Sequence, residues 1–219
     1  MKKSKLVLCA FSLFAGMCCQ VAFPDTISLE SKEGAIDYDR LEAAVQQRAK
    51  SRDWNGVRPP EWNGVQSFRA RFANGGIYFL ASSVVIRLDP SFKGSGYPGG
   101  RGWCEFDFFD QNYRYVNGIR VNIQDYSNTN VCNWIEGVSA VTYKGQPALL
   151  TTVQYHRGID PAKTVDEIGN NYHRFTALLV LTPDQDGSLS IRQDDSCLGP
   201  GNRIGELATA RKRIAECSQ

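Results

Sequence analysis

Three carboxylates lie among aromatic side chains in the short stretch from Trp103 to Asp110. The acids are Glu105, Asp107 and Asp110. If the stretch is a strand, its side chains alternate between two faces, so Glu105 and Asp107 share one face and Asp110 points to the other. A bulge at Phe108–Phe109 would add one residue and bring Asp110 to the same face. The pattern therefore predicts a row of three acids that depends on one bulge.

Two carboxylates on one face of a strand are the groups that retaining hydrolysis of a glycosidic bond requires. One carboxylate attacks the sugar carbon and the other protonates the leaving oxygen, with about 5 to 5.5 Å between them. Residues two apart on a strand lie about 6.6 Å apart along the chain. A third acid can separate the two titrations and keep one acid protonated near neutral pH. The alternative is an ordinary amphipathic strand whose solvent face carries Glu105 and Asp107.

The rest of the chain predicts a β-rich scaffold for these acids. From Gln66 onward, apolar and polar residues alternate with the period of strands. About eight such segments follow one another without helices, which favours a mainly β fold: an antiparallel β-sandwich, jelly-roll-like. One helix is expected to begin near Asp37, which can cap it, and another to extend from about Glu206 to Glu216. The alternative is an α+β fold with a single antiparallel sheet.

The dipeptide Asn117–Gly118 has two interpretations. Asn-Gly is the strongest short-range signal for a two-residue hairpin. In a continuous strand, however, the apolar residues before and after the dipeptide would all lie on the same face. A hairpin there would instead set Tyr115 opposite Arg120. We therefore favour one strand that passes through Asn117–Gly118.

The beginning of the chain predicts export. Residues 1–22 resemble a secretory signal peptide, with three lysines, an apolar run and a weak cleavage site at Ala22. Residues 23–36 are expected to form a loose leader, and residues 37–219 a single domain. Removal of the signal peptide takes away three lysines and no acids, so the formal net charge changes from +2 to −1. A nearly neutral protein has no electrostatic attraction to nucleic acid or to an anionic membrane. We expect an extracytoplasmic protein, periplasmic or secreted, with no membrane association after signal removal.

Cysteine usage agrees with export. Four cysteines remain after residue 22, and an even number in an exported chain predicts two disulfides, for which three connectivities are possible. We favour Cys104 with Cys132, and Cys197 with Cys217. The sequence contains no Cys-x-x-Cys zinc motif, phosphate loop, Gly-x-Ser-x-Gly elbow or His-Glu-x-x-His helix. We therefore expect no metal and no cofactor.

Several aromatic and histidine side chains could line a polysaccharide site. Tyr97, Trp103 and Tyr155 carry rings that can stack on sugars. His156 and His173 end and begin two predicted strands joined by one loop, so they are expected to lie close together if those strands pair. As hydrogen-bond donors they would suit a polyol ligand. As ordinary strand-end histidines they need no function.

The acidic stretch resembles the active-site strand of glycoside hydrolase family sixteen, the laminarinase- and lichenase-type β-glucanases. The motif of that family is Glu-x-Asp with a final Glu after a bulge. Segments 68–76, 97–100 and 172–184 are similar to the upstream strand, the approach loop and the Phe-His-x-Tyr strand with its turn. The resemblance covers residues 66–192 in patches.

This resemblance implies a concanavalin-like jelly roll and a role for each acid. Glu105 would be the nucleophile, Asp107 its helper and Asp110 the acid/base. The chain departs from the family at its final acid, because Asp reaches about 1.5 Å less far than Glu. A cysteine-tethered helix also stands where the family has its closing strands.

Two functions of different classes remain open. The first is an exported carbohydrate-active domain that binds or hydrolyses a β-glucan-like polysaccharide. The second is a non-enzymatic periplasmic binding or inhibitor protein, similar in role to immunity proteins, whose partner is another protein. Three acids on one face of an open groove would favour the first function. Asp110 in a turn, with Glu105 in an ion pair on a convex surface, would count against the first function.

Overall fold

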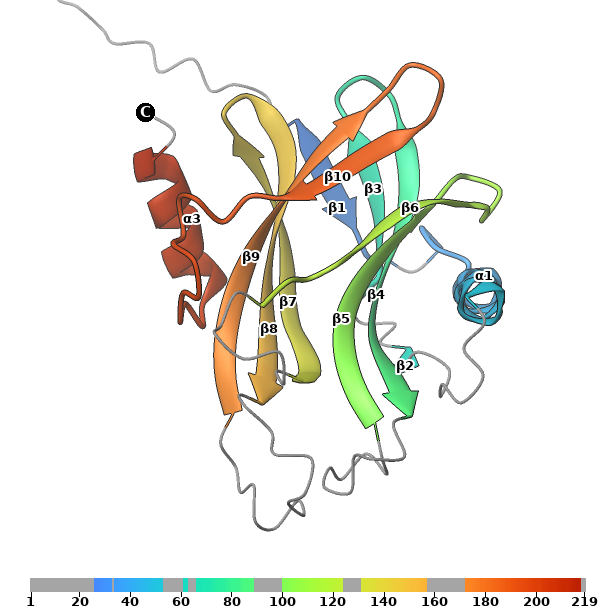
Figure 1. The fold of residues 1–219 in the computed structure, drawn as a ribbon. Coiled ribbons are helices and arrows are strands. Elements are labelled where there is room, and N and C mark those ends of the chain that lie inside the picture. Colours follow the sequence, from blue (N-terminus) through green and yellow to red (C-terminus); the bar gives the residue numbers. More distant parts are fainter. Residues whose placement is uncertain are drawn as a thin grey trace, which may run out of the picture.

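The computed structural model describes residues 26–32, 34–52, 61–62, 66–88, 100–123, 131–156 and 172–217. They form two antiparallel sheets packed face to face, with a helix outside each sheet (Figure 1). The elements are β1 (Ile27–Glu30), α1 (Tyr38–Ser51), β2 (Glu61–Trp62), β3 (Phe68–Phe72), β4 (Ile77–Leu88), β5 (Gly100–Phe109), β6 (Tyr115–Arg120), β7 (Val131–Tyr143), β8 (Gln146–His156), β9 (Tyr172–Pro183), β10 (Leu189–Gln193) and α3 (Leu207–Cys217). The predicted mainly β sandwich with two terminal helices is confirmed.

The two sheets meet along both of their edges. Sheet 1 has the order β1-β3-β4-β5-β6, with β2 paired to β4, and sheet 2 has the order β10-β9-β8-β7. At one edge, the side-chain amide of Asn117 on β6 donates a hydrogen bond of 2.7 Å to the carbonyl of Leu189 on β10. At the other edge, the hydroxyls of Thr26 and Thr142 lie 3.1 Å apart. These polar contacts join the edges of the sandwich.

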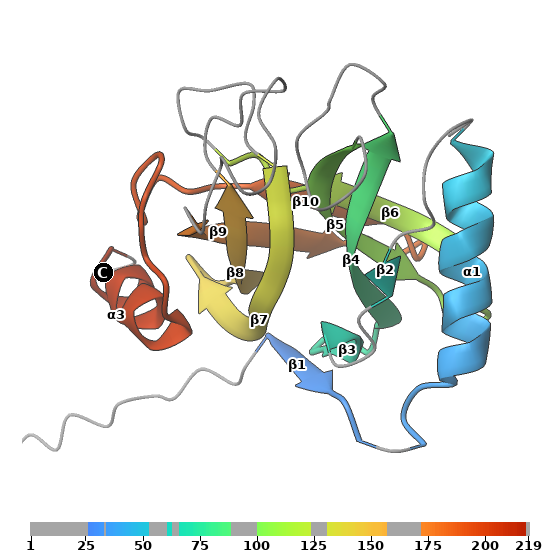
Figure 2. The same ribbon diagram turned by 90° about the horizontal axis from the view of Figure 1, so that it is seen from below.

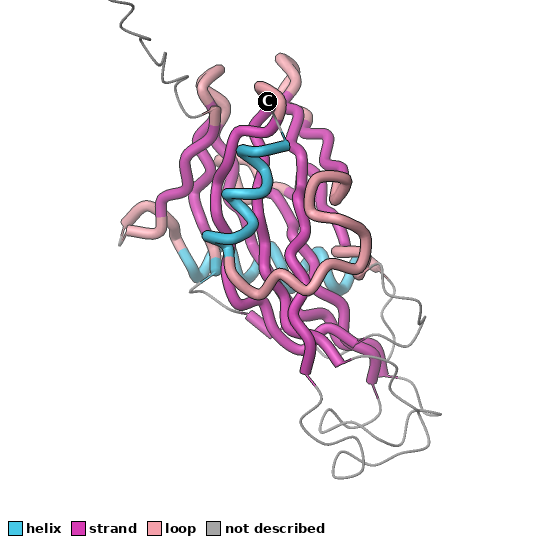
Figure 3. The backbone as a smooth tube through the Cα atoms, turned by 90° about the vertical axis from the view of Figure 1, so that its left-hand side faces the viewer, coloured by secondary structure: helices cyan, strands magenta, loops and turns pink. Residues whose placement is uncertain are grey.

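Alternation along the strands builds the core between the sheets. On β5, Phe106 and Phe108 point inward and are fully buried. α1 packs on the outer face of sheet 1 and α3 on the outer face of sheet 2 (Figures 2 and 3). The carboxylate of Asp37 accepts a hydrogen bond from the backbone N–H of Arg40, as expected for the cap of α1. The layers are therefore helix, sheet, sheet and helix.

Both predicted disulfides are present. The bridge between Cys104 and Cys132 joins β5 of sheet 1 to β7 of sheet 2 inside the core. The bridge between Cys197 and Cys217 ties the end of α3 to the segment after β10. Two disulfides are typical of proteins in an oxidising compartment. Within the described residues, no helix is long and apolar enough to cross a membrane.

The prediction of a loose leader over residues 23–36 is wrong for the part that forms β1. Ile27 to Glu30 pair with β3 in antiparallel register, and Ile27 is buried in the core. The short run Ile27-Ser28-Leu29 alternates as a strand does, but its period-two pattern is too brief to be decisive in sequence. The proposed signal peptide, residues 1–22, lies outside the described residues.

Candidate functional site

The acids of β5 lie on the outer face of sheet 1, beneath the C-terminal end of α1. Glu105 and Asp107 alternate with the inward-facing Phe106 and Phe108, so they share one face as predicted. Phe109 belongs to the same outer face and packs against the apolar stripe of α1. Glu105 is 2% exposed and Asp107 is 5% exposed. Two carboxylates are therefore buried between a sheet and a helix.

The bulge predicted at Phe108–Phe109 occurs on the neighbouring strand instead. β5 pairs with β4 in continuous register along its whole length. The register irregularity arises opposite β6, where Phe108 pairs with Asn117 and Phe109 pairs with Tyr115, which leaves Val116 as the extra residue. Because the extra residue is not in β5, the bulge does not change the direction of the residue that follows β5.

Asp110 does not join the other two acids. It follows the end of β5 in a turn, where its Oδ1 accepts hydrogen bonds from the backbone N–H groups of Asn112 (2.8 Å) and Arg114 (2.9 Å). This is the usual behaviour of an aspartate that stabilises a turn through its own side chain. The predicted row of three acids is therefore wrong.

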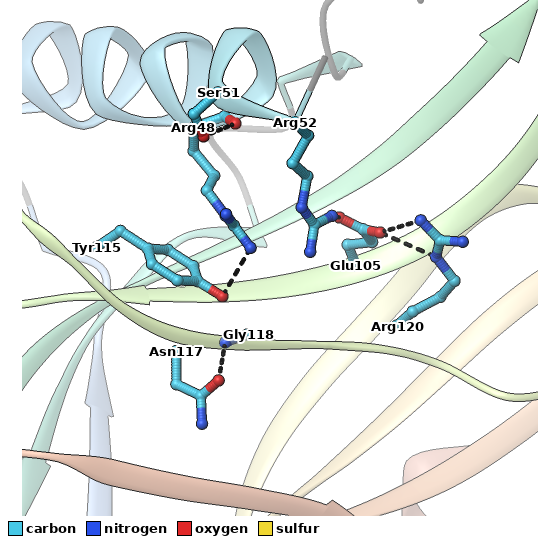
Figure 4. A network of polar contacts seen from close by, with 8 residues as sticks. All are labelled: Arg48, Ser51, Arg52, Glu105, Tyr115, Asn117, Gly118 and Arg120. Atoms are coloured by element: carbon cyan, nitrogen blue, oxygen red, sulfur yellow. Dashed lines mark hydrogen bonds and ion pairs between the residues drawn. The ribbon is translucent and has the colours of Figure 1, made fainter. Parts of the chain in front are cut away.

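Two arginines hold the Glu105 carboxylate from opposite sides (Figure 4). Arg52, at the C-terminal cap of α1, donates from Nη1 to Glu105 Oε2 at 2.6 Å. Arg120 lies opposite Glu105 on β6 and donates from Nε and Nη2 to Oε1 at 2.9 and 2.7 Å. Both oxygens therefore accept charge-assisted hydrogen bonds, which compensate the burial of the carboxylate.

Three arginines of this region lie over aromatic rings. The guanidinium carbon lies 4.3 Å from the ring centroid for Arg120 over Trp103, 3.8 Å for Arg48 over Tyr115, and 4.6 Å for Arg40 over Tyr113. Arg48 also donates a hydrogen bond of 3.0 Å to the Tyr115 hydroxyl. Such stacking restricts a long side chain before any ligand arrives. We call these residues, together with Arg52, the arginine–aromatic face: Arg40, Arg48, Arg52, Arg120, Trp103, Tyr113 and Tyr115.

Asp107 lies between two small neighbours. Its cross-strand partners are Ala81 on β4 and Gly118 on β6. The pKa of Asp107 is raised to about 6, mainly by burial and also by the negative charge of Glu105, while Arg52 and Arg48 oppose the increase. Asp107 therefore changes its charge between about pH 5 and pH 7, a range that is common at functional sites.

Asn117–Gly118 lies inside β6, so the predicted continuous strand is confirmed. Gly118 is needed because Asp107 approaches it closely: a Cβ at this position would overlap Oδ1 of Asp107 and lie 3.0 Å from the carbonyl oxygen of Phe106. Glycine inside a strand often marks such an approach. The dipeptide that suggested a hairpin thus accommodates a buried acid.

We expect Gly118→Ala to lower the free energy of unfolding by about 1 to 3 kcal/mol, because the new methyl group overpacks the contact with Asp107. Urea denaturation measures this change. Adding Asp107→Ala should recover most of the loss, since the side chain in the way is then removed. Strictly additive effects of the two substitutions would contradict the close contact.

Most of the other side chains predicted to bind a ligand are not found beside Glu105 in the described residues. Tyr155 is buried in the core, so its ring is not exposed for stacking on a ligand. Tyr155 pairs with His173, and His156 pairs with Tyr172. The two histidines therefore lie on adjacent strands of sheet 2, as predicted, but their side chains point to opposite faces of the sheet. Among the predicted stacking rings, Trp103 is the one on the arginine–aromatic face. Tyr97 lies outside the described residues.

The arginines were missed in the sequence, although a signal was present. Arg48 and Arg52 are four residues apart, which places them as neighbours on one side of a helix. That side faces the acids of β5 once α1 is docked on sheet 1. In the described parts of the chain, no group of three or more His, Cys, Asp or Glu side chains could hold a metal ion.

No family model, curated protein or solved structure matches the chain. The resemblance to glycoside hydrolase family sixteen consequently depends on the acidic stretch and on the three short segments 68–76, 97–100 and 172–184.

Proposed function

We propose that the mature protein is an exported, non-enzymatic binding protein that recognises acidic side chains of a protein partner, as an inhibitor or immunity-type protein does. The observation that carries this proposal is the state of Glu105. A nucleophilic carboxylate must reach a sugar carbon, but Glu105 is 2% exposed and both its oxygens accept hydrogen bonds from arginines. Its role is then to position the guanidinium groups of Arg52 and Arg120.

The composition of the arginine–aromatic face supports an acidic protein partner. Its four arginines outnumber the two buried acids, Glu105 and Asp107, so the face carries excess positive charge. Guanidinium groups match carboxylates in shape and can bind them with two parallel hydrogen bonds. Arginine, tyrosine and tryptophan are also the residues that contribute most at protein interfaces. Stacked side chains lose little further freedom on binding, which favours affinity.

The proposal is tested by the affinity of arginine variants for the protein that co-purifies with the wild type from the extracytoplasmic fraction of the producing cell. We expect Arg48→Ala combined with Arg120→Ala to weaken binding about 100-fold or more, measured by calorimetry. The matched control is Arg192→Ala, since Arg192 is an exposed arginine of β10 paired with Asp194. Equal losses in the control, or no loss in the double variant, would contradict this binding face.

A retaining glycosidase is the second candidate, and Asp107 is the observation that favours it. Its pKa of about 6, beside a second carboxylate, is in the range of an acid that donates a proton in such pairs. Glu105 and Asp107 would then act on a β-glucan-like substrate, as the resemblance to family sixteen implies. Asp110, held in its turn, would take no part.

Reducing-sugar release separates the two candidates. We expect none from laminarin or lichenan with the purified mature protein, because the Glu105 carboxylate is enclosed by its arginines. The control reaction contains Glu105→Gln. Release by the wild type that this variant abolishes would establish the glycosidase and overturn the non-enzymatic proposal.

A further inference from the structure

Two large aromatic side chains are exposed on the outer face of sheet 2. Trp134 on β7 is 44% exposed and Tyr172 on β9 is 42% exposed. α3 covers the other end of this face, where Leu150 and Leu178 are buried beneath it. The two aromatic residues lie on the strands that flank β8, so their backbones are about 10 Å apart across the sheet and are offset by two residues, about 7 Å, along it.

Polar groups lie between the two rings. Trp134 pairs with Gln154 on β8, and His156 pairs with Tyr172. The amide of Gln154 is oriented because its Oε1 accepts a hydrogen bond of 2.7 Å from Asn133. The imidazole of His156 lies 4.1 Å from the Tyr172 ring, centroid to centroid. We call Trp134, Gln154, His156 and Tyr172 the sheet 2 platform.

The platform carries no net charge at neutral pH. Burial and the neighbouring His173 lower the pKa of His156, which favours its neutral form. Nδ1 of His156 is buried and has no hydrogen-bond partner among the described residues, so the neutral ring can hold its proton on Nε2. Among the residues that the structure describes, Arg174 on β9 lies beside Gln154, and it donates two hydrogen bonds of 2.9 and 2.7 Å to Glu136, which neutralises its charge.

We propose that the sheet 2 platform binds an uncharged carbohydrate. A sugar ring has faces of C–H groups that can stack on Trp134 and Tyr172, and its hydroxyl groups can exchange hydrogen bonds with the Gln154 amide and the His156 imidazole. A neutral ligand complements a neutral surface, whereas the arginine–aromatic face on sheet 1 suits an anionic one. The inference is independent of the proposed function because the two surfaces belong to different sheets.

Affinity electrophoresis of the intact mature protein in gels containing laminarin, lichenan or xylan tests this inference. We expect retardation by at least one of these neutral polysaccharides. Trp134→Ala should weaken it at least tenfold, and Trp134→Phe, which keeps a ring, should preserve most of it. The matched control is Tyr115→Ala, which removes an exposed ring from the arginine–aromatic face and should leave retardation unchanged.

Three results would overturn the inference. These are no retardation by any of the three polysaccharides, retardation that survives both Trp134→Ala and Tyr172→Ala, and retardation that Tyr115→Ala abolishes. If Trp134→Ala does not fold, Tyr172→Ala and Gln154→Ala test the platform in its place. Both are expected to weaken retardation at least tenfold. Loss of partner binding by arginine variants, with retardation intact, would leave the platform in place and show that the two surfaces act separately.

Discussion

Asp107→Asn is expected to make the protein about 3 kcal/mol more stable than the wild type above pH 7, and no more stable near pH 3.5. The folded-state pKa of Asp107 is raised from 3.8 to about 6. A raised pKa means that the contribution of Asp107 to stability is fully present below pH 3.8 and is lost as the pH rises through about 6. About two pH units at 1.36 kcal/mol each give the expected difference. Asparagine resembles the protonated acid and does not lose this contribution.

Urea denaturation of both proteins at intervals between pH 3.5 and 8 measures this difference. Groups other than Asp107 titrate in the same range, but they contribute equally to both proteins and cancel in the comparison. Asp110→Asn is the matched control, because Asp110 lies in a turn and no comparable gain is expected there. A constant difference between wild type and Asp107→Asn at every pH would contradict the raised pKa.

Glu105→Gln is expected to lower the free energy of unfolding by about 3 kcal/mol at pH 7. Glutamine keeps the shape of the side chain but removes the charge that compensates Arg52 and Arg120. Breaking a buried ion pair costs about 3 to 5 kcal/mol. The lower end applies because the side chains of Arg52 and Arg120 are 27% and 44% exposed and can be partly hydrated.

Glu136→Gln is the matched control for Glu105→Gln. Glu136 also accepts hydrogen bonds from an arginine, Arg174, but that arginine side chain is 57% exposed. Surface pairs contribute about 0 to 1 kcal/mol. A second measurement follows from the same contact: the pKa of Asp107, measured by NMR, should fall in Glu105→Gln because a neighbouring negative charge is removed. Similar losses in both variants would contradict the anchoring role of Glu105.

An ionisable Asp107 beneath α1 costs stability at neutral pH, and a neutral residue would avoid that cost. Acids kept in such positions are common where charge is used for binding or catalysis. Here its ionisation changes the net charge beside Arg48 and Arg52. Protonation near pH 5 leaves the arginine–aromatic face more positive, which favours an acidic partner.

The sequence predicted the scaffold well because local patterns determine it. Period-two alternation placed most strands and put Glu105 and Asp107 on one face. The even cysteine count predicted two disulfides, and the favoured one of three connectivities is present. Asp37 marked the start of α1 through its capping preference. The strand through Asn117–Gly118 followed from an unbroken apolar phase, even though the dipeptide itself favours a hairpin.

The site was harder to predict because tertiary contacts form it. Arg52 and Glu105 are 53 residues apart in sequence, and only the docking of α1 on sheet 1 brings them together. The bulge was expected in β5, whereas the extra residue is Val116 in β6. Side-chain alternation within one strand does not show which of two paired strands carries the extra residue. Exposure of Trp134 depends on how far α3 covers sheet 2, which is also a tertiary property.

Site-specific photo-cross-linking tests the central claim, that the arginine–aromatic face binds a protein partner. A photoreactive phenylalanine analogue replaces Tyr115, which is exposed on this face, and in a control protein it replaces Lys212, which is exposed on α3. We expect one defined protein adduct from position 115, lost when Arg48→Ala and Arg120→Ala are added, and none from position 212. Equal adducts from both positions, or no protein adduct from position 115 in producing cells, would contradict this claim.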